Sequence, residues 1–256
     1  MQLCKLCTEV ANLRESHIIP KFLYKYMIKI TDNNLTQFNG LLNLWQKSNR
    51  QLKKKLLCED CEQLLGKNET LFSEIFKSIN LEKNKGLYTY VEFDEEQYNE
   101  LAEKGFSKND IDGLLVDNPI YDKLEIIRYF SVSYMFRELI NNPYDVSENE
   151  LKKIRLFLQN KCDFPFMLTV RVHDGQPEFN LFSTVIVMDS LPDWKHYVFY
   201  IPNMQFHVAL NINGTPEHMN KTFITLANFF TDEIGTLNQL KKYQSSAKIA
   251  HNLKKT

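Results

Sequence analysis

The spacing of apolar residues changes along the chain, from a helical period in the first two thirds to an alternating period in the last third. Apolar side chains that recur every three or four residues predict amphipathic helices. Helices are therefore expected at 20–30, 59–80, 122–141 and 147–161. Ser147 and Glu150 have the spacing of a capping box, which supports the start of the last of these helices.

Strands are expected where valine, isoleucine, phenylalanine and tyrosine become frequent and turn residues separate short runs. The runs lie at 166–173, 179–188, 196–201 and 205–212, and they predict a small antiparallel sheet. A final packed helix is predicted to begin at Thr215 and Pro216. Its apolar positions are Phe223, Leu226, Ala227, Phe230 and Ile234.

Length and composition indicate a folded chain with a buried core. The chain has 256 residues, of which 43% are hydrophobic and 25% charged. No apolar run approaches the length of about 18 residues that a membrane span needs, and the first residues do not resemble a secretory signal. We therefore expect a cytoplasmic protein with no membrane partner.

Charge is balanced overall but uneven along the sequence. The formal net charge is −1, which excludes a uniformly basic protein that binds polyanions over its whole surface. Residues 1–61 carry ten basic and five acidic side chains, whereas residues 81–125 carry twelve acidic and five basic ones. The first region could face nucleic acid and the second a protein partner, although solvated helix faces would give the same pattern.

Four of the five cysteines form two Cys-x-x-Cys pairs. Cys4 and Cys7 lie near the start of the sequence, and Cys58 and Cys61 follow about fifty residues later. In a reducing compartment, such pairs are typical of a tetrahedral zinc site, because a short turn brings two thiolates to one ion. A thioredoxin-like redox site needs one pair beside a strand–helix–strand unit, which this sequence does not offer. Cys162 is expected to be a buried, inert thiol.

The surroundings of the two pairs predict a treble-clef zinc unit, because the second pair begins a helix and a folded segment separates the pairs. The fold class is therefore α+β: this zinc-binding unit, a helical middle, the small antiparallel sheet and the C-terminal helix. The expected divisions are a zinc-stapled domain at 1–80, an acidic connector at 81–121 and a helical and sheet domain at 122–256.

A short apolar stretch after the first pair carries a family resemblance. His17, Ile18, Ile19 and Pro20 come ten residues after Cys7 and precede the pair at Cys58 and Cys61. In this order the sequence resembles the HNH, or His-Me finger, endonucleases. The resemblance covers residues 1 to about 78, and the added histidine string makes it more specific than paired cysteines alone.

The resemblance implies a phosphodiesterase mechanism. The family's strand histidine activates a water that attacks phosphorus, while a divalent ion stabilises the developing charge. His17 matches this general base, and the four cysteines match structural zinc ligands. Family members usually place histidine or asparagine after the last cysteine as a ligand of the catalytic ion, whereas this chain has Glu62, an oxygen donor suited to Mg²⁺ or Mn²⁺.

Further residues of the zinc-stapled domain have both functional and structural interpretations. Glu69 lies two helical turns from Glu62, too far to share an ion directly, and Asn49 is a candidate for the family's middle asparagine. His17 could instead only fix the zinc loop, and Glu62 could only complement the helix dipole. Candidate contacts to the phosphates of DNA or RNA are Lys21, Lys25, Arg50, Lys53, Lys54 and Lys55.

Two function hypotheses follow. One is an HNH-like, metal-dependent nuclease, which family association would place in bacterial defence against phages or mobile DNA. The other is a catalytically inactive, zinc-binding interaction module for a protein or nucleic-acid partner. His173, His196, His207 and His218 lack the spacing of ligands, so packing or surface roles are expected for them.

Overall fold

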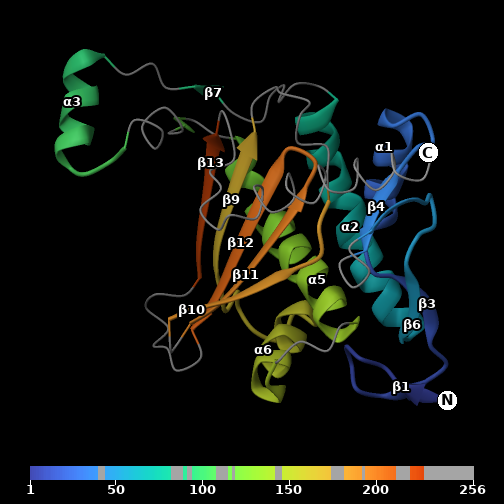
Figure 1. The fold of residues 1–256 in the computed structure, drawn as a ribbon. Coiled ribbons are helices and arrows are strands. Elements are labelled where there is room, and N and C mark those ends of the chain that lie inside the picture. The colour runs from blue at the N-terminus through green and yellow to red at the C-terminus, as the bar shows by residue number, and fades with distance from the viewer. Residues whose placement is uncertain are drawn as a thin grey trace.

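The computed structural model is a mixed α+β fold (Figure 1). It describes residues 1–39, 44–81, 89–90, 94–107, 115–116, 119–141, 146–173, 182–191, 194–211 and 220–227. The buried apolar residues of the N-terminal elements, the central helices and the sheet belong to one continuous core cluster. The division into three regions stays a prediction. No helix among the described residues is long and apolar enough to cross a membrane.

Short strand pairs and two helices make up the N-terminal part. Strands β1 (Gln2–Leu3) and β2 (Val10–Ala11) form an antiparallel pair around the first two cysteines. Strand β3 (Arg14–His17) pairs antiparallel with β6 (Lys53–Leu57), which leads directly into the second cysteine pair. Between them lie helix α1 (Lys21–Ile30) and the antiparallel strands β4 (Thr36–Asn39) and β5 (Leu44–Lys47).

The predicted helices are found close to their expected bounds. They are α1, α2 (Glu59–Asn80), α5 (Leu124–Asn141) after the short 3₁₀ turn η1 (Pro119–Lys123), and α6 (Glu148–Leu158). The capping box of Ser147 and Glu150 is confirmed. Helix α5 is buried on almost every side and packs against α2, where the rings of Phe72 and Phe130 stack with centroids 3.6 Å apart. This packing joins the cysteine-bearing helix to the centre of the molecule.

A five-stranded sheet completes the fold, in the order β10–β11–β12–β9–β13. Its strands are β9 (Met167–His173), β10 (Ile186–Leu191), β11 (Trp194–Ile201), β12 (Met204–Asn211) and β13 (Lys221–Ala227). Phe199 of β11 stacks on Tyr134 of α5, which lies across one face of the sheet (Figure 1). Strand β10 starts later than predicted, since 182–185 are not in a strand and 179–181 lie outside the described residues.

The prediction of a helix over 221–227 was wrong. These residues form β13, which pairs parallel with β9, so the sheet is mixed rather than purely antiparallel. Alternation decides the outcome: Ile224 is 4% exposed while its neighbour Phe223 is 49% exposed, a period of two that suits a strand. The threonines of this run also favour a strand. The predicted helix positions Phe230 and Ile234 lie outside the described residues.

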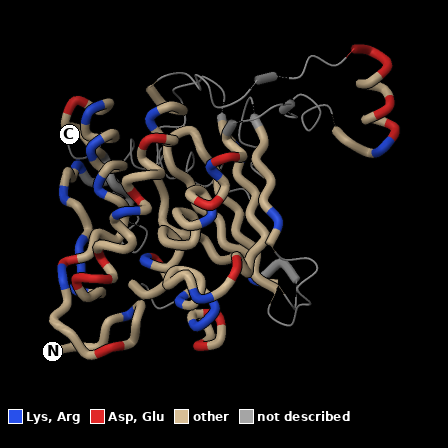
Figure 2. Tube along the Cα trace, turned by 180° about the vertical axis from the view of Figure 1, so that it is seen from behind, with Lys and Arg blue, Asp and Glu red and all other residues tan. Residues whose placement is uncertain are grey.

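The acidic connector is described only in part. Strands β7 (Thr89–Tyr90) and β8 (Leu115–Val116) pair antiparallel, and helix α3 (Glu95–Glu103) begins at a capping box formed by Asp94 and Gln97. None of the residues of α3 is buried, and Figures 1 and 2 show this largely acidic helix set apart from the other described elements. A protein partner for this segment stays a prediction.

Candidate metal centre and the residues around it

The two cysteine pairs meet in space. The four Sγ atoms of Cys4, Cys7, Cys58 and Cys61 all lie within 4.8 Å of one another, and those of Cys7 and Cys58 are 3.8 Å apart. A tetrahedral ion with Zn–S bonds of about 2.3 Å separates its ligand sulfurs by about 3.8 Å. The predicted cluster is thus confirmed, and its geometry is consistent with a zinc-binding unit.

Local backbone contacts place these sulfurs. The first pair lies in a turn between β1 and β2, where the amide of Cys4 donates to the carbonyl of Glu9 at 2.8 Å and that of Lys5 to the carbonyl of Leu56 at 2.9 Å. Cys58 is the N-cap of α2 and Cys61 lies in its first turn. The amide of Cys58 donates to Sγ of Cys4 at 3.3 Å, which ties the two knuckles together directly.

The donor set calls for a cation. Burial alone would raise the pKa of Cys4, but backbone hydrogen bonds from Cys58, Cys7 and Leu6 outweigh it and lower the pKa to about 7. Burial and the neighbouring sulfurs raise the pKa of Cys61 far above its ordinary value. One thiolate is therefore favoured, whereas four would repel one another unless a divalent ion neutralised them. The residues present fit a structural zinc ion.

Helix α6 holds the first knuckle from the other side. Arg155 Nε donates to the carbonyl of Lys5 at 2.9 Å, and Gln159 Nε2 donates to the carbonyl of Leu6 at 3.0 Å. These two bonds satisfy carbonyl groups of the turn that carries Cys4 and Cys7. The cysteine cluster is thereby joined to a helix about 150 residues further along the chain.

His17 lies at the end of β3, beside Lys53 of β6. Its Nε2 is 2.7 Å from Oε1 of Gln51. Because an amide oxygen only accepts, Nε2 carries the proton and Nδ1 is the basic nitrogen. Partial burial lowers the pKa of His17, Gln51 acts in the opposite direction, and the positive charges of Lys53, Arg137 and Lys21 lower it further. The imidazole is therefore neutral near pH 7.

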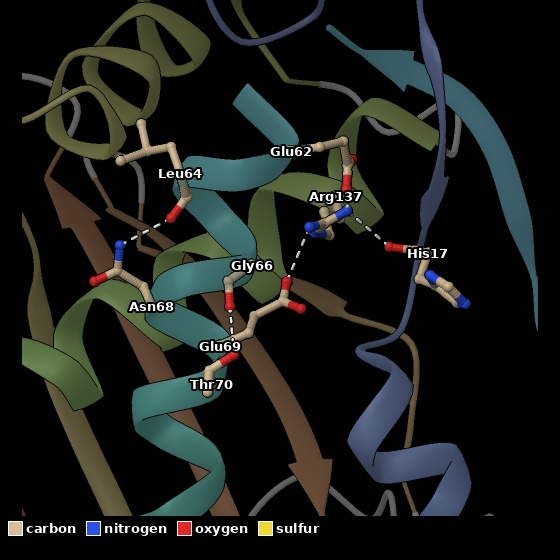
Figure 3. A network of polar contacts seen from close by, with 8 residues as sticks. All are labelled: His17, Glu62, Leu64, Gly66, Asn68, Glu69, Thr70 and Arg137. Atoms are coloured by element: carbon tan, nitrogen blue, oxygen red, sulfur yellow. Dashed lines mark hydrogen bonds and ion pairs between the residues drawn. The ribbon is translucent and has the colours of Figure 1, made fainter. Parts of the chain in front are cut away.

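Glu62 and Glu69 meet Arg137 of α5 rather than the imidazole of His17 (Figure 3). Arg137 is 2% exposed; its Nη1 lies 3.2 Å from Glu62 Oε1 and its Nη2 lies 2.9 Å from Glu69 Oε1. The same Nη1 donates to the carbonyl of His17 at 3.0 Å. Figure 3 shows the His17 ring on the other side of its backbone from the guanidinium. The carboxylates and the ring are thus joined through a backbone contact only.

The two carboxylates differ in accessibility. The side chain of Glu69 is 15% exposed and that of Glu62 is 22% exposed. Burial raises the pKa of Glu69, and the charge of Arg137 only partly offsets this. Glu62, with its longer ion pair and greater exposure, is the carboxylate that a divalent ion would reach from solvent.

The predicted nucleic-acid contacts lie on the exposed side of the N-terminal elements, where basic positions recur in Figure 2. Lys53, Lys54 and Lys55 are exposed on β6. Lys54 Nζ donates to the carbonyl of Asn141 at 3.4 Å. The remaining exposed cations are Lys21 and Lys25 of α1, and Arg50 just before β6. The structure therefore brings these basic residues to the same part of the molecule as His17.

Other candidates have structural surroundings. Asn49 accepts from the amide of Leu35 at 3.2 Å and donates to the carbonyl of Asn33 at 2.8 Å, so it braces a loop. Cys162 is exposed, which corrects the expectation of a buried thiol; it follows the end of α6, beyond the packed turn.

The remaining histidines lie on the sheet or outside the described residues. Nδ1 of His207 is 3.1 Å from Nε2 of His196 on the neighbouring strand. His173 ends β9, and His218 lies outside the described part of the chain.

Two residues of the site were missed by sequence reasoning. Arg137 had a signal: it interrupts an otherwise apolar helix, and a buried arginine requires carboxylate partners. Gln51 had none, because nothing in its sequence surroundings distinguishes it from other polar residues before a strand.

No family model, curated protein or solved structure matches this chain. The resemblance to HNH endonucleases therefore stands on the chain's own residues.

Proposed function

We propose that this protein is an HNH-like nuclease that hydrolyses phosphodiester bonds of nucleic acid, with His17 as general base and a treble-clef zinc site as its frame. The supporting observation is the state of His17. Its ring is half-buried, its protonated Nε2 is fixed by Gln51 at 2.7 Å, and its pKa is lowered, so Nδ1 is available to take a proton from water.

Structural zinc would be held by Cys4, Cys7, Cys58 and Cys61 and would do no chemistry. A catalytic Mg²⁺ or Mn²⁺ ion would take Glu62 as its protein ligand and supply positive charge at the scissile phosphate. Because Glu62 is paired with Arg137 at 3.2 Å, the ion has to compete with the guanidinium for this carboxylate. The basic residues near His17 supply the attraction for a polyanion. Defence against phages or mobile DNA, in a bacterial cytoplasm, is the setting that the family resemblance suggests.

A second function is favoured by the same ion pairs. Arg137 already neutralises both Glu62 and Glu69, as a bound cation would. In that case the protein is a binding module that keeps the zinc frame and the basic surface but does not hydrolyse. The two functions differ in one observable, which is product formation.

The test is incubation of the zinc-loaded protein with supercoiled DNA and with structured RNA, each in the presence of Mg²⁺ or Mn²⁺. We expect cleavage by the wild type and a loss of about 100-fold or more for His17→Ala, which removes the general base. Zinc content and thermal midpoint of the variant serve as folding controls. Cleavage that persists in His17→Ala, or intact substrates with every metal and the wild type, would reject the nuclease; binding without cleavage would establish the module.

A further inference from the structure

Helices α1 and α2 enclose a groove of about 210 Å³ on the side of the molecule that carries His17. One wall is formed by Lys21, Phe22 and Lys25 of α1. The opposite wall includes Gly66, Thr70 and Ser73 of α2. We refer to this feature as the α1–α2 groove. It is far larger than a single water or metal ion requires.

The α1 wall is cationic. Lys21 and Lys25 are exposed, and their spacing of four residues places them on the same face of the helix. No acidic residue lies in the first turn of α1, so no carboxylate of that turn competes for Lys21. Pro20, the N-cap, makes no side-chain hydrogen bond to the helix. The positive end of the helix and two lysines thus adjoin the groove.

The α2 wall is small and uncharged apart from one compensated carboxylate. The hydroxyl of Thr70 donates to the carbonyl of Gly66 at 2.9 Å, and that of Ser73 donates to the carbonyl of Thr70 at 2.7 Å. Glu69 also lines the groove, but Arg137 Nη2 holds its Oε1 at 2.9 Å. The balance of charge in the groove is therefore positive, which suits an anionic group.

Gly66 keeps the groove open. A Cβ atom placed on Gly66 would have no other atom within 4 Å, so open space faces this position. Because Gly66 is inside a regular helix, a larger side chain there would project into the groove without displacing a neighbour, and it would raise helix propensity. This position offers a way to fill the groove while the fold is kept.

The groove adjoins the proposed general base. Only Ile18, Ile19 and Pro20 separate His17 from Lys21, and the charge of Lys21 is close enough to lower the pKa of His17. A chain of phosphates that presents one group to His17 would therefore pass Lys21 and Lys25 next. Single phosphate ions have no reason to span both positions, whereas a nucleic-acid strand does.

We propose that the α1–α2 groove binds a backbone phosphate of a nucleic-acid strand, next to the phosphate presented to His17, with Lys21 and Lys25 as its cationic partners. This inference rests on the proposed function, since it assigns the path of the substrate strand. Phe22 supplies an apolar wall for the attached sugar or base.

Binding of a labelled single-stranded oligonucleotide, followed by fluorescence anisotropy over a range of salt concentrations, tests the proposal. We expect Gly66→Leu to weaken binding about 10-fold, because it occupies the groove. The double variant Lys21→Gln/Lys25→Gln should weaken binding at low salt and reduce the salt slope by about 2, the value for two lost phosphate contacts. Matched controls are Gly66→Ala, with a short side chain, and Lys29→Gln, on the same helix but outside the groove; both should bind within about 2-fold of the wild type.

The outcomes separate the groove from the nuclease activity. If Gly66→Leu keeps its thermal midpoint and zinc content and binds like the wild type, or if the oligonucleotide does not bind the wild type, the groove proposal is overturned. The proposal also fails if inorganic phosphate raises the thermal midpoint of the wild type but oligonucleotide affinity is the same in all variants. Binding that follows the expected order without cleavage supports the groove and rejects the nuclease. Cleavage with unchanged binding in the variants does the reverse.

Discussion

At the scale of single residues, the account depends on the protonation state of His17. Gln51 fixes the proton on Nε2, and the positive charges around the ring, together with burial, lower its pKa. A lowered pKa means that the folded protein prefers the neutral imidazole. Protonation of His17 below its unfolded pKa therefore costs stability as the pH falls, and it removes the base that hydrolysis requires.

Substitution of Lys53 by glutamine tests this electrostatic arrangement. Removal of the positive charge should raise the pKa of His17 towards its ordinary value, so the acid limb of the cleavage profile should move to higher pH. An NMR titration of the imidazole follows the same change independently of cleavage. Lys55→Gln, two residues along β6 with its charge not among those acting on His17, is the control. A wild-type pKa above 6.5, or a downward shift in Lys53→Gln, would contradict the account.

At the scale of elements, the sequence pattern was informative wherever one period held over a whole segment. The helical spacing of α2 predicted its extent, and in the structure Phe72, Ile75 and Phe76 are buried while Leu71 is 45% exposed. The helix expected at 221–227 was wrong because its apolar residues fit both periods over a short run, and pairing with β9 decided between them.

The candidate site was predictable only in part, for a related reason. Cysteine spacing identified four ligands from two local motifs, but the guanidinium that binds Glu62 and Glu69 comes from α5, 75 residues from Glu62. Such a contact has no local pattern in one sequence. It depends on how α2 and α5 pack, which is a property of the tertiary structure.

Replacement of Arg137 by methionine tests the role of this contact between elements. The change leaves two carboxylates of α2 and the carbonyl of His17 without their shared partner, so the free energy of unfolding should fall by about 3–5 kcal/mol in urea denaturation. Arg128→Met is the control on the same helix: its partner Glu125 is 76% exposed, and loss of that pair should cost about 1 kcal/mol or less. Equal losses for both arginines would show that the buried ion pairs have no special weight.

At the scale of the whole molecule, the cysteine cluster links the two ends of the N-terminal part and connects them to the rest. Cys4 and Cys7 belong to the first turn, Cys58 and Cys61 begin α2, and α6 contacts the first turn through Arg155. Helix α2 continues into the core through Phe72. An ion bound by the four sulfurs would therefore stabilise the arrangement of β3, β6 and α2 that positions His17.

The most direct measurement of this central claim is the metal content of the purified protein after dialysis, determined by elemental analysis. We predict a single zinc ion per chain, loss of that zinc with a lower thermal midpoint in Cys61→Ser, and full retention in Cys162→Ser, whose sulfur lies outside the cluster. Wild-type protein that carries no transition metal and is not stabilised when zinc is added, or Cys61→Ser protein that binds zinc like the wild type, would contradict the account.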